Sequence, residues 1–136
     1  MTDDVRRLGD RYEVGDLLGR GGMAEVHEGR WWVDGARRRD LDGCVDVDLE
    51  ASLATNTLAL HRLDLSSPTA VDVPAAFVRA DDLRVERLEQ RYRCTARDHE
   101  LIAVAYDSST FGVALTLTFD GAGLVVDYPG LGHRHR

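Results

Sequence analysis

The sequence predicts a mainly β protein with a curved antiparallel sheet and an N-terminal β-hairpin. Three observations favour this class. Short apolar runs recur along the chain, and several of them alternate with period two. Turns rich in Gly and Asp separate these runs. No strand–helix–strand pattern repeats. A length of 136 residues allows one modest hydrophobic core and excludes a two-lobed enzyme.

The first expected element is a β-hairpin in residues 11–30, RYEVGDLLGRGGMAEVHEGR. This stretch resembles the glycine-rich loop at the start of bacterial serine/threonine protein kinases, in which backbone N–H groups hold ATP phosphates. Ala24 stands where that loop has its third glycine. The residues that the resemblance would assign to nucleotide binding are Gly19, Gly21, Gly22 and Val26.

The rest of a kinase is missing from the sequence. All 17 basic residues other than His are Arg, so no Lys can contact the phosphates. The strings HRLD at 61–64 and TFG at 110–112 lack the catalytic and metal-binding Asp, and we attribute them to chance. We therefore expect residues 1–30 to form a kinase-like hairpin without kinase activity, and the protein not to be an enzyme. The alternative is a non-functional or regulatory kinase remnant that retains only this loop.

Beyond Trp31, two runs favour strands in the first half of the remaining chain. VDVDL at 45–49 alternates apolar and acidic residues, which predicts that Val45, Val47 and Leu49 face the core. TNTLALHRLDL at 55–65 is expected to follow as a strand with Leu58, Leu60 and Leu63 inward.

Two further strands are expected in the middle of the chain. AVDVPAAFVRA at 70–80 carries Pro74, which predicts an edge or a break in the ladder. LRVERLEQRYRCTA at 83–96 also has some helical spacing, but Val85 and Tyr92 favour one long, bulged strand.

Three strands complete the set, at 100–106, 111–119 and 124–128. DGAG between the last two predicts a hairpin turn in which Gly121 and Gly123 accept positive φ.

A second resemblance covers residues 31–134. The strings WWVDG, DLDGCVDVDLEASLATNTLALHRL, FVRADDLRVERLEQRY and DGAGLVVDYPGL are similar, in order and spacing, to the C-terminal half of the bacterial putative glycolipid-binding family, formerly a domain of unknown function. The resemblance implies a partial spiral β-roll over residues 31–136 that binds a lipid or glycolipid. Because the hairpin replaces the N-terminal half of the roll, a fused or truncated gene product is expected.

A carrier of this kind needs an apolar trough and a few polar groups at its mouth. Asp46 and Asp48 share one strand face, where like charges repel unless solvent, an arginine or a ligand hydroxyl separates them. Turns and arginine pairs would explain the polar residues equally well, and an ordinary core would explain the aromatic ones. The ligand-binding candidates are Asp42, Cys44, Asp46, Asp48, Asn56, Thr57, Tyr92, Tyr106, Phe111 and Tyr128.

Composition bounds the remaining possibilities. A net charge of −7 argues against nucleic acid as a partner, and the arginines at 37–39 are expected to form a solvated turn. No apolar run would span a bilayer and no secretion signal is visible, so a cytoplasmic location is expected. No cofactor or metal is expected, because Cys44 and Cys94 are isolated and the histidines lack ligating neighbours. Self-association through open sheet edges is a further hypothesis.

Overall fold

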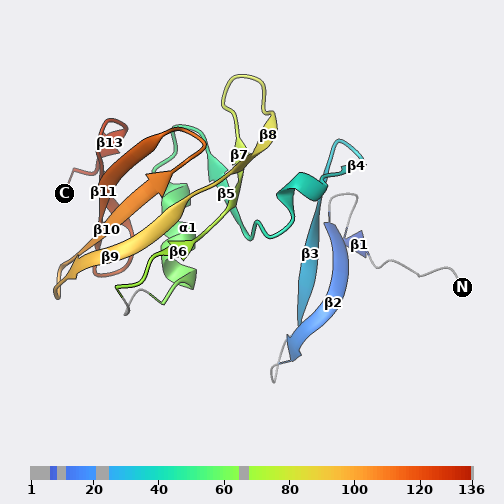
Figure 1. The fold of residues 1–136 in the computed structure, drawn as a ribbon, viewed down its shortest axis with the longest axis horizontal. Helices are drawn as coiled ribbons and strands as arrows, with labels where there is room; N and C mark the ends of the chain where they lie inside the picture. The colour runs from blue at the N-terminus through green and yellow to red at the C-terminus, as the bar shows by residue number, and fades with distance from the viewer. Residues whose placement is uncertain (1–6, 9–11, 21–24, 65–67, 136) are drawn as a thin grey trace, which may run out of the picture. The chain divides into compact units, whose positions relative to one another are not determined.

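The computed structural model describes residues 7–8, 12–20, 25–64 and 68–135. The chain forms two compact units, Met1–Gly43 and Cys44–Arg136. Both are built mainly from β-strands that form curved, largely antiparallel sheets (Figure 1). The predicted fold class is therefore confirmed.

The N-terminal unit is one sheet that contains the predicted hairpin. Its longest strands pair antiparallel, with Tyr12 opposite Trp31. The Glu13 carboxylate is buried and accepts hydrogen bonds from Arg30 Nη1 at 2.6 Å and Trp32 Nε1 at 3.2 Å. The elements are β1 (Arg7–Leu8), β2 (Tyr12–Arg20), β3 (Glu25–Val33), β4 (Ala36–Arg37) and a 3₁₀ turn, η1 (Arg39–Leu41).

The larger sheet of the C-terminal unit has six strands in the order β13-β12-β11-β10-β9-β6, and all its pairings are antiparallel. Three of these strands confirm the strands predicted at 100–106, 111–119 and 124–128, with bounds that differ by at most two residues. The strands are β6 (Val71–Asp72), β9 (Arg91–Arg97), β10 (Leu101–Ser108), β11 (Val113–Asp120), β12 (Val125–Tyr128) and β13 (Gly132–His133).

The smaller sheet of this unit contains β5 (Asp46–Leu49), β7 (Ala75–Val78) and β8 (Val85–Leu88) in the order β5-β7-β8. β5 and β7 run parallel, whereas the sequence predicted an antiparallel sheet. Parallel neighbours need a crossover connection, and helix α1 (Ala54–Arg62) lies between them in sequence.

Helix α1 replaces the strand expected at 55–65, so that prediction is wrong. The buried residues of the helix follow the spacing of one helical face rather than alternation. Leu60 is buried as expected, whereas Leu58 is 49% exposed on the opposite side. The residues buried on the helical face are Asn56, Thr57, Ala59 and Leu60.

The predicted orientation of β5 is also wrong, because its acidic residues face inward. Asp46 is only 7% exposed, whereas Val45 is 66% and Leu49 45% exposed. The Asp46 carboxylate forms an ion pair with Arg62 at the end of α1, which compensates its burial. The alternation of apolar and acidic residues predicted the strand correctly but predicted the wrong buried face. The acidic face is buried because helix α1, which packs against this strand, supplies Arg62 as the partner of Asp46.

The long strand predicted at 83–96 is divided in two. Its first part is β8 of the smaller sheet and its second part is β9 of the larger sheet, so the chain changes sheets at Glu89 and Gln90. A register shift in the β9–β10 pairing agrees with the expected bulge. The break expected at Pro74 is confirmed, since it separates β6 from β7.

The main core lies between α1 and one face of the six-stranded sheet (Figure 1). Strand β10 contributes alternate residues to it, as period-two geometry requires. Its largest fully buried side chains include Tyr92, Tyr106 and Phe119. The buried residues of this core are Ala59, Leu60, Val73, Tyr92, Ile102, Val104, Tyr106, Leu117, Phe119 and Val125.

The predicted turn between β11 and β12 also fixes the end of α1. Gly123 has φ +78°, as expected, whereas Gly121 does not adopt positive φ. The Asp120 carboxylate accepts hydrogen bonds from the backbone N–H groups of Ala122 and Leu124 at 3.0 and 2.9 Å. The ring of His61 hydrogen-bonds through Nε2 to the Ala122 carbonyl at 2.9 Å, which joins the helix to the turn.

Replacing Gly123 with Ala is expected to lower the free energy of unfolding by about 2 kcal/mol. About 1 kcal/mol comes from the positive φ, and about 1 kcal/mol from loss of the His61 hydrogen bond. A Cβ at Gly123 would lie 2.7 Å from His61 Cδ2, so the ring must move. Urea denaturation measures the loss.

The control is Gly112→Ala, which has φ +63° but no atom within 4 Å of the added Cβ. The loss of stability in this variant measures the free-energy cost of the positive φ alone. In a His61→Ala background, the cost of Gly123→Ala should fall to that of Gly112→Ala. An unchanged cost would contradict the steric explanation.

Candidate functional site

The candidate site is a cavity of about 420 Å³ in the C-terminal unit. It lies where the turn after β5, the end of β7, strands β10 and β11 and the segment after β12 meet. Its exposed apolar residues include Leu49, Phe111 and Leu131, each at least 40% exposed. The lining residues are Asp48, Leu49, Glu50, Ala51, Ser52, Asn56, Phe77, Arg79, Tyr106, Phe111, Val113, Leu115, Tyr128, Pro129, Gly130 and Leu131.

Other hollows in the described parts of the chain have a different character. One in the C-terminal unit is lined by Asp72, Glu89, Gln90, Arg91, Asp107 and Ser109. One in the N-terminal unit is lined by Glu13, Arg30, Trp32, Arg37, Arg39 and Asp42. Both are lined mainly by charged side chains, whereas the candidate site combines an apolar wall with a few polar groups, as small-molecule sites do.

Asp48 is the most informative polar residue of the cavity. Its carboxylate accepts a hydrogen bond from Thr55 Oγ1 at 2.5 Å. No Arg or His of the described residues forms an ion pair with it. Burial raises the pKa of Asp48 above its usual value, and the Thr55 hydrogen bond opposes that change only in part. The fold therefore keeps a desolvated carboxylate here without a compensating cation.

Three tyrosines lie close to one another beside Asp48. The rings of Tyr92 and Tyr106 are 5.4 Å apart in an edge-to-face arrangement, and those of Tyr106 and Tyr128 are 6.0 Å apart. Asn56 Nδ2 donates a hydrogen bond to the Tyr92 hydroxyl at 3.1 Å. Burial raises the pKa of all three tyrosines, and the charge of Asp48 raises each further. The three hydroxyls therefore remain protonated at neutral pH.

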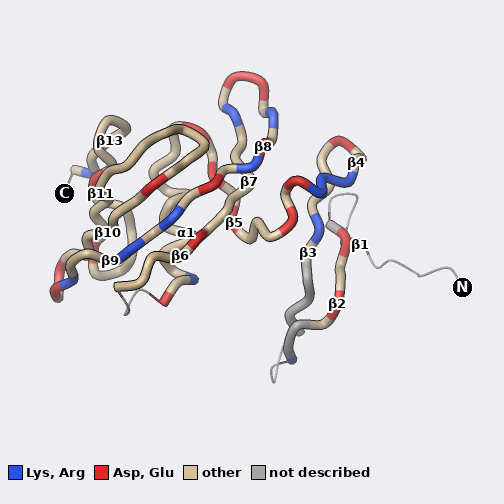
Figure 2. The backbone as a smooth tube through the Cα atoms, in the orientation of Figure 1, with Lys and Arg blue, Asp and Glu red and all other residues tan. Residues whose placement is uncertain are grey.

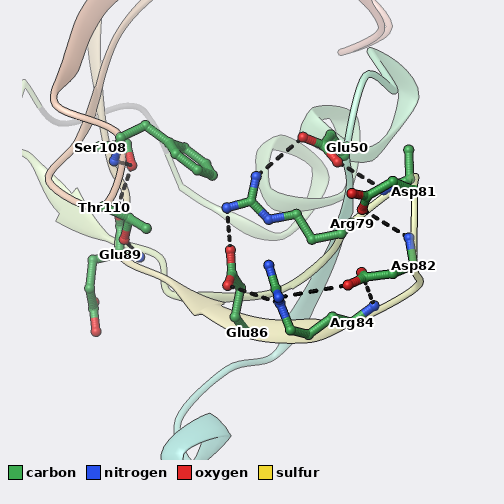
Figure 3. Close-up of polar contacts among 11 residues, drawn as sticks. Glu50, Arg79, Asp81, Asp82, Arg84, Glu86, Glu89, Ser108 and Thr110 are labelled. Atoms are coloured by element: carbon green, nitrogen blue, oxygen red, sulfur yellow. Dashed lines mark hydrogen bonds and ion pairs between the residues drawn. The ribbon is translucent and has the colours of Figure 1, made fainter.

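Arg79 forms the other polar feature of the cavity wall. Its guanidinium carbon lies 5.2 Å from the ring centroid of Phe77 and 5.5 Å from that of Phe111. Its Nη1 and Nη2 reach Glu50 and Glu86 at 3.2 and 2.6 Å, on either side of the side chain (Figure 3). Glu50 also accepts a hydrogen bond from the Ala80 N–H at 2.8 Å, and this bond, together with the hydrogen bond and charge of Arg79, lowers the pKa of Glu50.

The loop that carries Phe111 is fixed to Glu89, which lies between β8 and β9. Ser108 Oγ donates to the Glu89 carbonyl at 2.9 Å, and Glu89 N–H donates to Thr110 Oγ1 at 2.9 Å (Figure 3). The Phe111 ring then packs edge-to-face on Phe77 at 5.1 Å. This side of the cavity is held by hydrogen bonds as well as by packing.

The structure brings five of the ten predicted ligand-binding residues to this cavity: Asp48, Asn56, Tyr106, Phe111 and Tyr128. Tyr92 lies directly behind it with no exposed surface. Sequence reasoning missed Arg79 and Glu50. Arg79 directly follows β7 and is two residues after Phe77, and this same-face spacing for an extended chain could have identified it.

The remaining predicted residues lie elsewhere. Asp46 is paired with Arg62, and Thr57 is buried in α1 without lining the cavity. Cys44 is buried, and its sulfur accepts a hydrogen bond from Arg87 Nη1 at 3.5 Å. Asp42 belongs to the N-terminal unit, where its carboxylate pairs with Arg37 at 2.7 Å. Arginine pairing, the explanation left open by the sequence, accounts for Asp42 and Asp46.

The kinase-like loop falls partly outside the described residues, which include neither Gly21 nor Gly22. Gly19 in β2 is opposite Val26 in β3, as in a continuing hairpin. Within the described ranges, no group of three His, Cys, Asp or Glu side chains is placed to hold a metal ion. No helix in those ranges is long and apolar enough to cross a membrane. Charges of both signs are intermixed along the C-terminal unit (Figure 2).

The fold and the cavity define a mainly β protein with a partly apolar pocket that has polar groups along one side. A family model described as putative glycolipid-binding matches residues 19–134. The chain belongs to this family. The match begins within the kinase-like stretch, earlier than the residue 31 expected from sequence, and the comparisons give no support to the kinase resemblance.

A solved structure of a DUF1089 family protein from Pseudomonas aeruginosa is similar to this chain, with a TM-score of 0.66 and 30% sequence identity. The similarity covers 82% of this chain and 62% of the Pseudomonas aeruginosa protein, so this chain spans less than two thirds of the length of that protein. No curated protein matches the chain.

Replacing Asp48 with Asn is expected to raise the free energy of unfolding at neutral pH by roughly 0.5–1 kcal/mol, because a desolvated charge is removed and the Thr55 hydrogen bond keeps its acceptor. The folded-state pKa of Asp48 lies above its unfolded value. The ionised Asp48 therefore destabilises the folded protein at pH values above its folded-state pKa, and this destabilisation is lost as the pH falls through that pKa. Urea denaturation at pH 7 and near pH 4 should show that the stabilisation of Asp48→Asn relative to the wild type is smaller at the lower pH.

Asp46→Asn is the matched control, since Asp46 lies two residues away on the same strand. It removes the partner of Arg62 and should destabilise the protein by about 1–2 kcal/mol, a value reduced because Arg62 is partly solvated. If both variants changed stability in the same direction, the contrast between the two carboxylates would be wrong.

Proposed function

We propose that the chain binds a lipid or glycolipid non-covalently in the cavity beside Asp48. The observation that carries this proposal is the coexistence of an apolar wall with a desolvated carboxylate that has no cation partner among the described residues. A ligand with an apolar chain and a polar head would satisfy both. The family to which the chain belongs supports the same conclusion.

The apolar part of the ligand is assigned to the wall that includes Phe111, Val113, Leu115 and Leu131. Each methylene group removed from water there would contribute about 0.8 kcal/mol to affinity. A volume of about 420 Å³ lies within the range of small-molecule sites. The cavity can therefore hold part of an acyl chain, with the remainder at its open side.

The polar part of the ligand is assigned to Asp48, Asn56 and Tyr128. Carboxylate and amide oxygens accept hydrogen bonds from hydroxyl groups, and the phenol can donate or accept. Hydroxyl donors would replace the hydration that Asp48 loses on burial.

The proposed activity is binding without chemistry. The described residues that line the cavity include neither His nor Cys, which are the usual general base and thiol nucleophile. Cys44 is buried elsewhere in the unit, and His61 is held on the β11–β12 turn.

Filling the cavity tests this proposal. Val113→Trp introduces a large ring at the apolar wall and should weaken binding of n-decyl β-D-glucoside, below its micelle concentration, by about tenfold or more. Isothermal titration calorimetry measures the affinity. Native mass spectrometry of the purified wild-type protein should also detect a retained amphiphile that the variant lacks.

Ala114→Trp provides the control. Ala114 follows Val113 on β11 but is exposed on the other face of the strand and does not line the cavity. This variant should bind like the wild type, with thermal melting verifying that both variants fold. Equal affinity of a folded Val113→Trp variant and the wild type would place the ligand elsewhere.

A further inference from the structure

The cavity contains a cation, but its charge is already matched. Arg79 reaches Glu50 and Glu86 with its two terminal nitrogens and packs over two aromatic rings. Its Nε is buried and has no acceptor among the described residues. An anionic ligand would have to compete with two carboxylates for this guanidinium, so Arg79 is poorly placed to attract one.

Asp48 is in the opposite situation. It lines the same cavity and has a hydroxyl partner, Thr55, but no ion pair with any described residue. Glu50 adds a second carboxylate to the lining, so the cavity presents two carboxylates and one Arg. A phosphate or sulfate brought next to Asp48 would add like-charge repulsion in a partly desolvated site, where screening is weak.

The neighbouring polar groups favour hydrogen-bond donors on the ligand. Asn56 uses Nδ2 to donate to the Tyr92 hydroxyl at 3.1 Å, so this donor is already engaged within the protein. The Asp48 carboxylate accepts from Thr55 and has capacity for further donors, since an ionised carboxylate has about four acceptor positions. Hydroxyl groups match this arrangement, whereas an anionic oxygen does not.

We propose that Asp48 determines head-group selectivity: the cavity accepts an amphiphile with an uncharged, hydroxyl-rich head and rejects one with an anionic head such as a phosphate monoester. This inference rests on the proposed binding function and adds the class of head group and the residue that selects it. Asp48 acts by accepting hydroxyl hydrogen bonds and by repelling negative charge. Arg79 keeps the aromatic wall in place without serving as an anion site.

The test compares n-decyl β-D-glucoside with n-decyl phosphate, which share one alkyl chain, by calorimetric titration at neutral pH and low salt. Wild-type protein should bind the glucoside at least about tenfold more tightly than the phosphate. Asp48→Asn removes the repulsion and one strong acceptor, so it should bind the phosphate about tenfold more tightly than wild type does and the glucoside more weakly.

Asp107→Asn is the charge-matched control. Asp107 follows Tyr106 on β10 but is exposed on the opposite face and is absent from the cavity lining. It makes the same change in net charge and should leave the preference of the wild type intact. An equal gain in phosphate binding from Asp107→Asn would mean that overall charge, not Asp48, sets the preference.

The remaining outcomes separate the two proposals. If neither amphiphile binds the wild-type protein, the proposed lipid-binding function is wrong, and the proposed selectivity is wrong as well. If both bind with equal affinity and Val113→Trp weakens both, the cavity is the binding site and the selectivity alone is wrong. If Asp48→Asn folds but leaves the preference unchanged, Asp48 is not the selecting residue.

Discussion

Two aspartates on one face of a four-residue strand connect helix α1 to the smaller sheet. Asp46 pairs with Arg62 at the end of the helix, and Asp48 accepts a hydrogen bond from Thr55 in its first turn. The helix therefore runs antiparallel to β5 while its other contacts reach the six-stranded sheet through Leu60 and the β11–β12 turn. The cavity depends on this arrangement, because α1 and the turn after β5 supply its polar side.

The two carboxylates differ in a way that bears on function. Asp46 is nearly inaccessible and has a cation partner, as buried charges normally do. Asp48 lacks such a partner among the described residues, and its raised pKa reflects the free-energy cost of burying its charge. Costs of this kind concentrate at binding sites, where a ligand supplies the missing interaction. Ala51, which also lines the cavity, has φ +62°, and this strained backbone is a second local free-energy cost there.

The opposite side of the cavity is rigid for a separate reason. Arg79 is held between Glu50 and Glu86 and contacts two aromatic rings, and the loop bearing Phe111 is bonded to Glu89. A wall fixed in this way loses little conformational entropy when an alkyl chain packs against it. The site thus combines a preorganised apolar wall with a polar side whose hydrogen-bonding capacity is incompletely used.

The sequence by itself determined the mainly β class, the N-terminal hairpin, the three C-terminal strands and the break at Pro74, because alternation and turn chemistry are local properties. It also singled out Asp48, Asn56, Tyr106, Phe111 and Tyr128, which the fold brings to one cavity. Only the tertiary structure decided that 54–62 is helical and that β5 turns its acids inward, since burial against a sheet and pairing with Arg62 override local pattern. It also decided which of the two aspartates of β5 lacks a cation partner among the described residues, because that depends on Arg62, which is 16 residues from Asp46 in sequence.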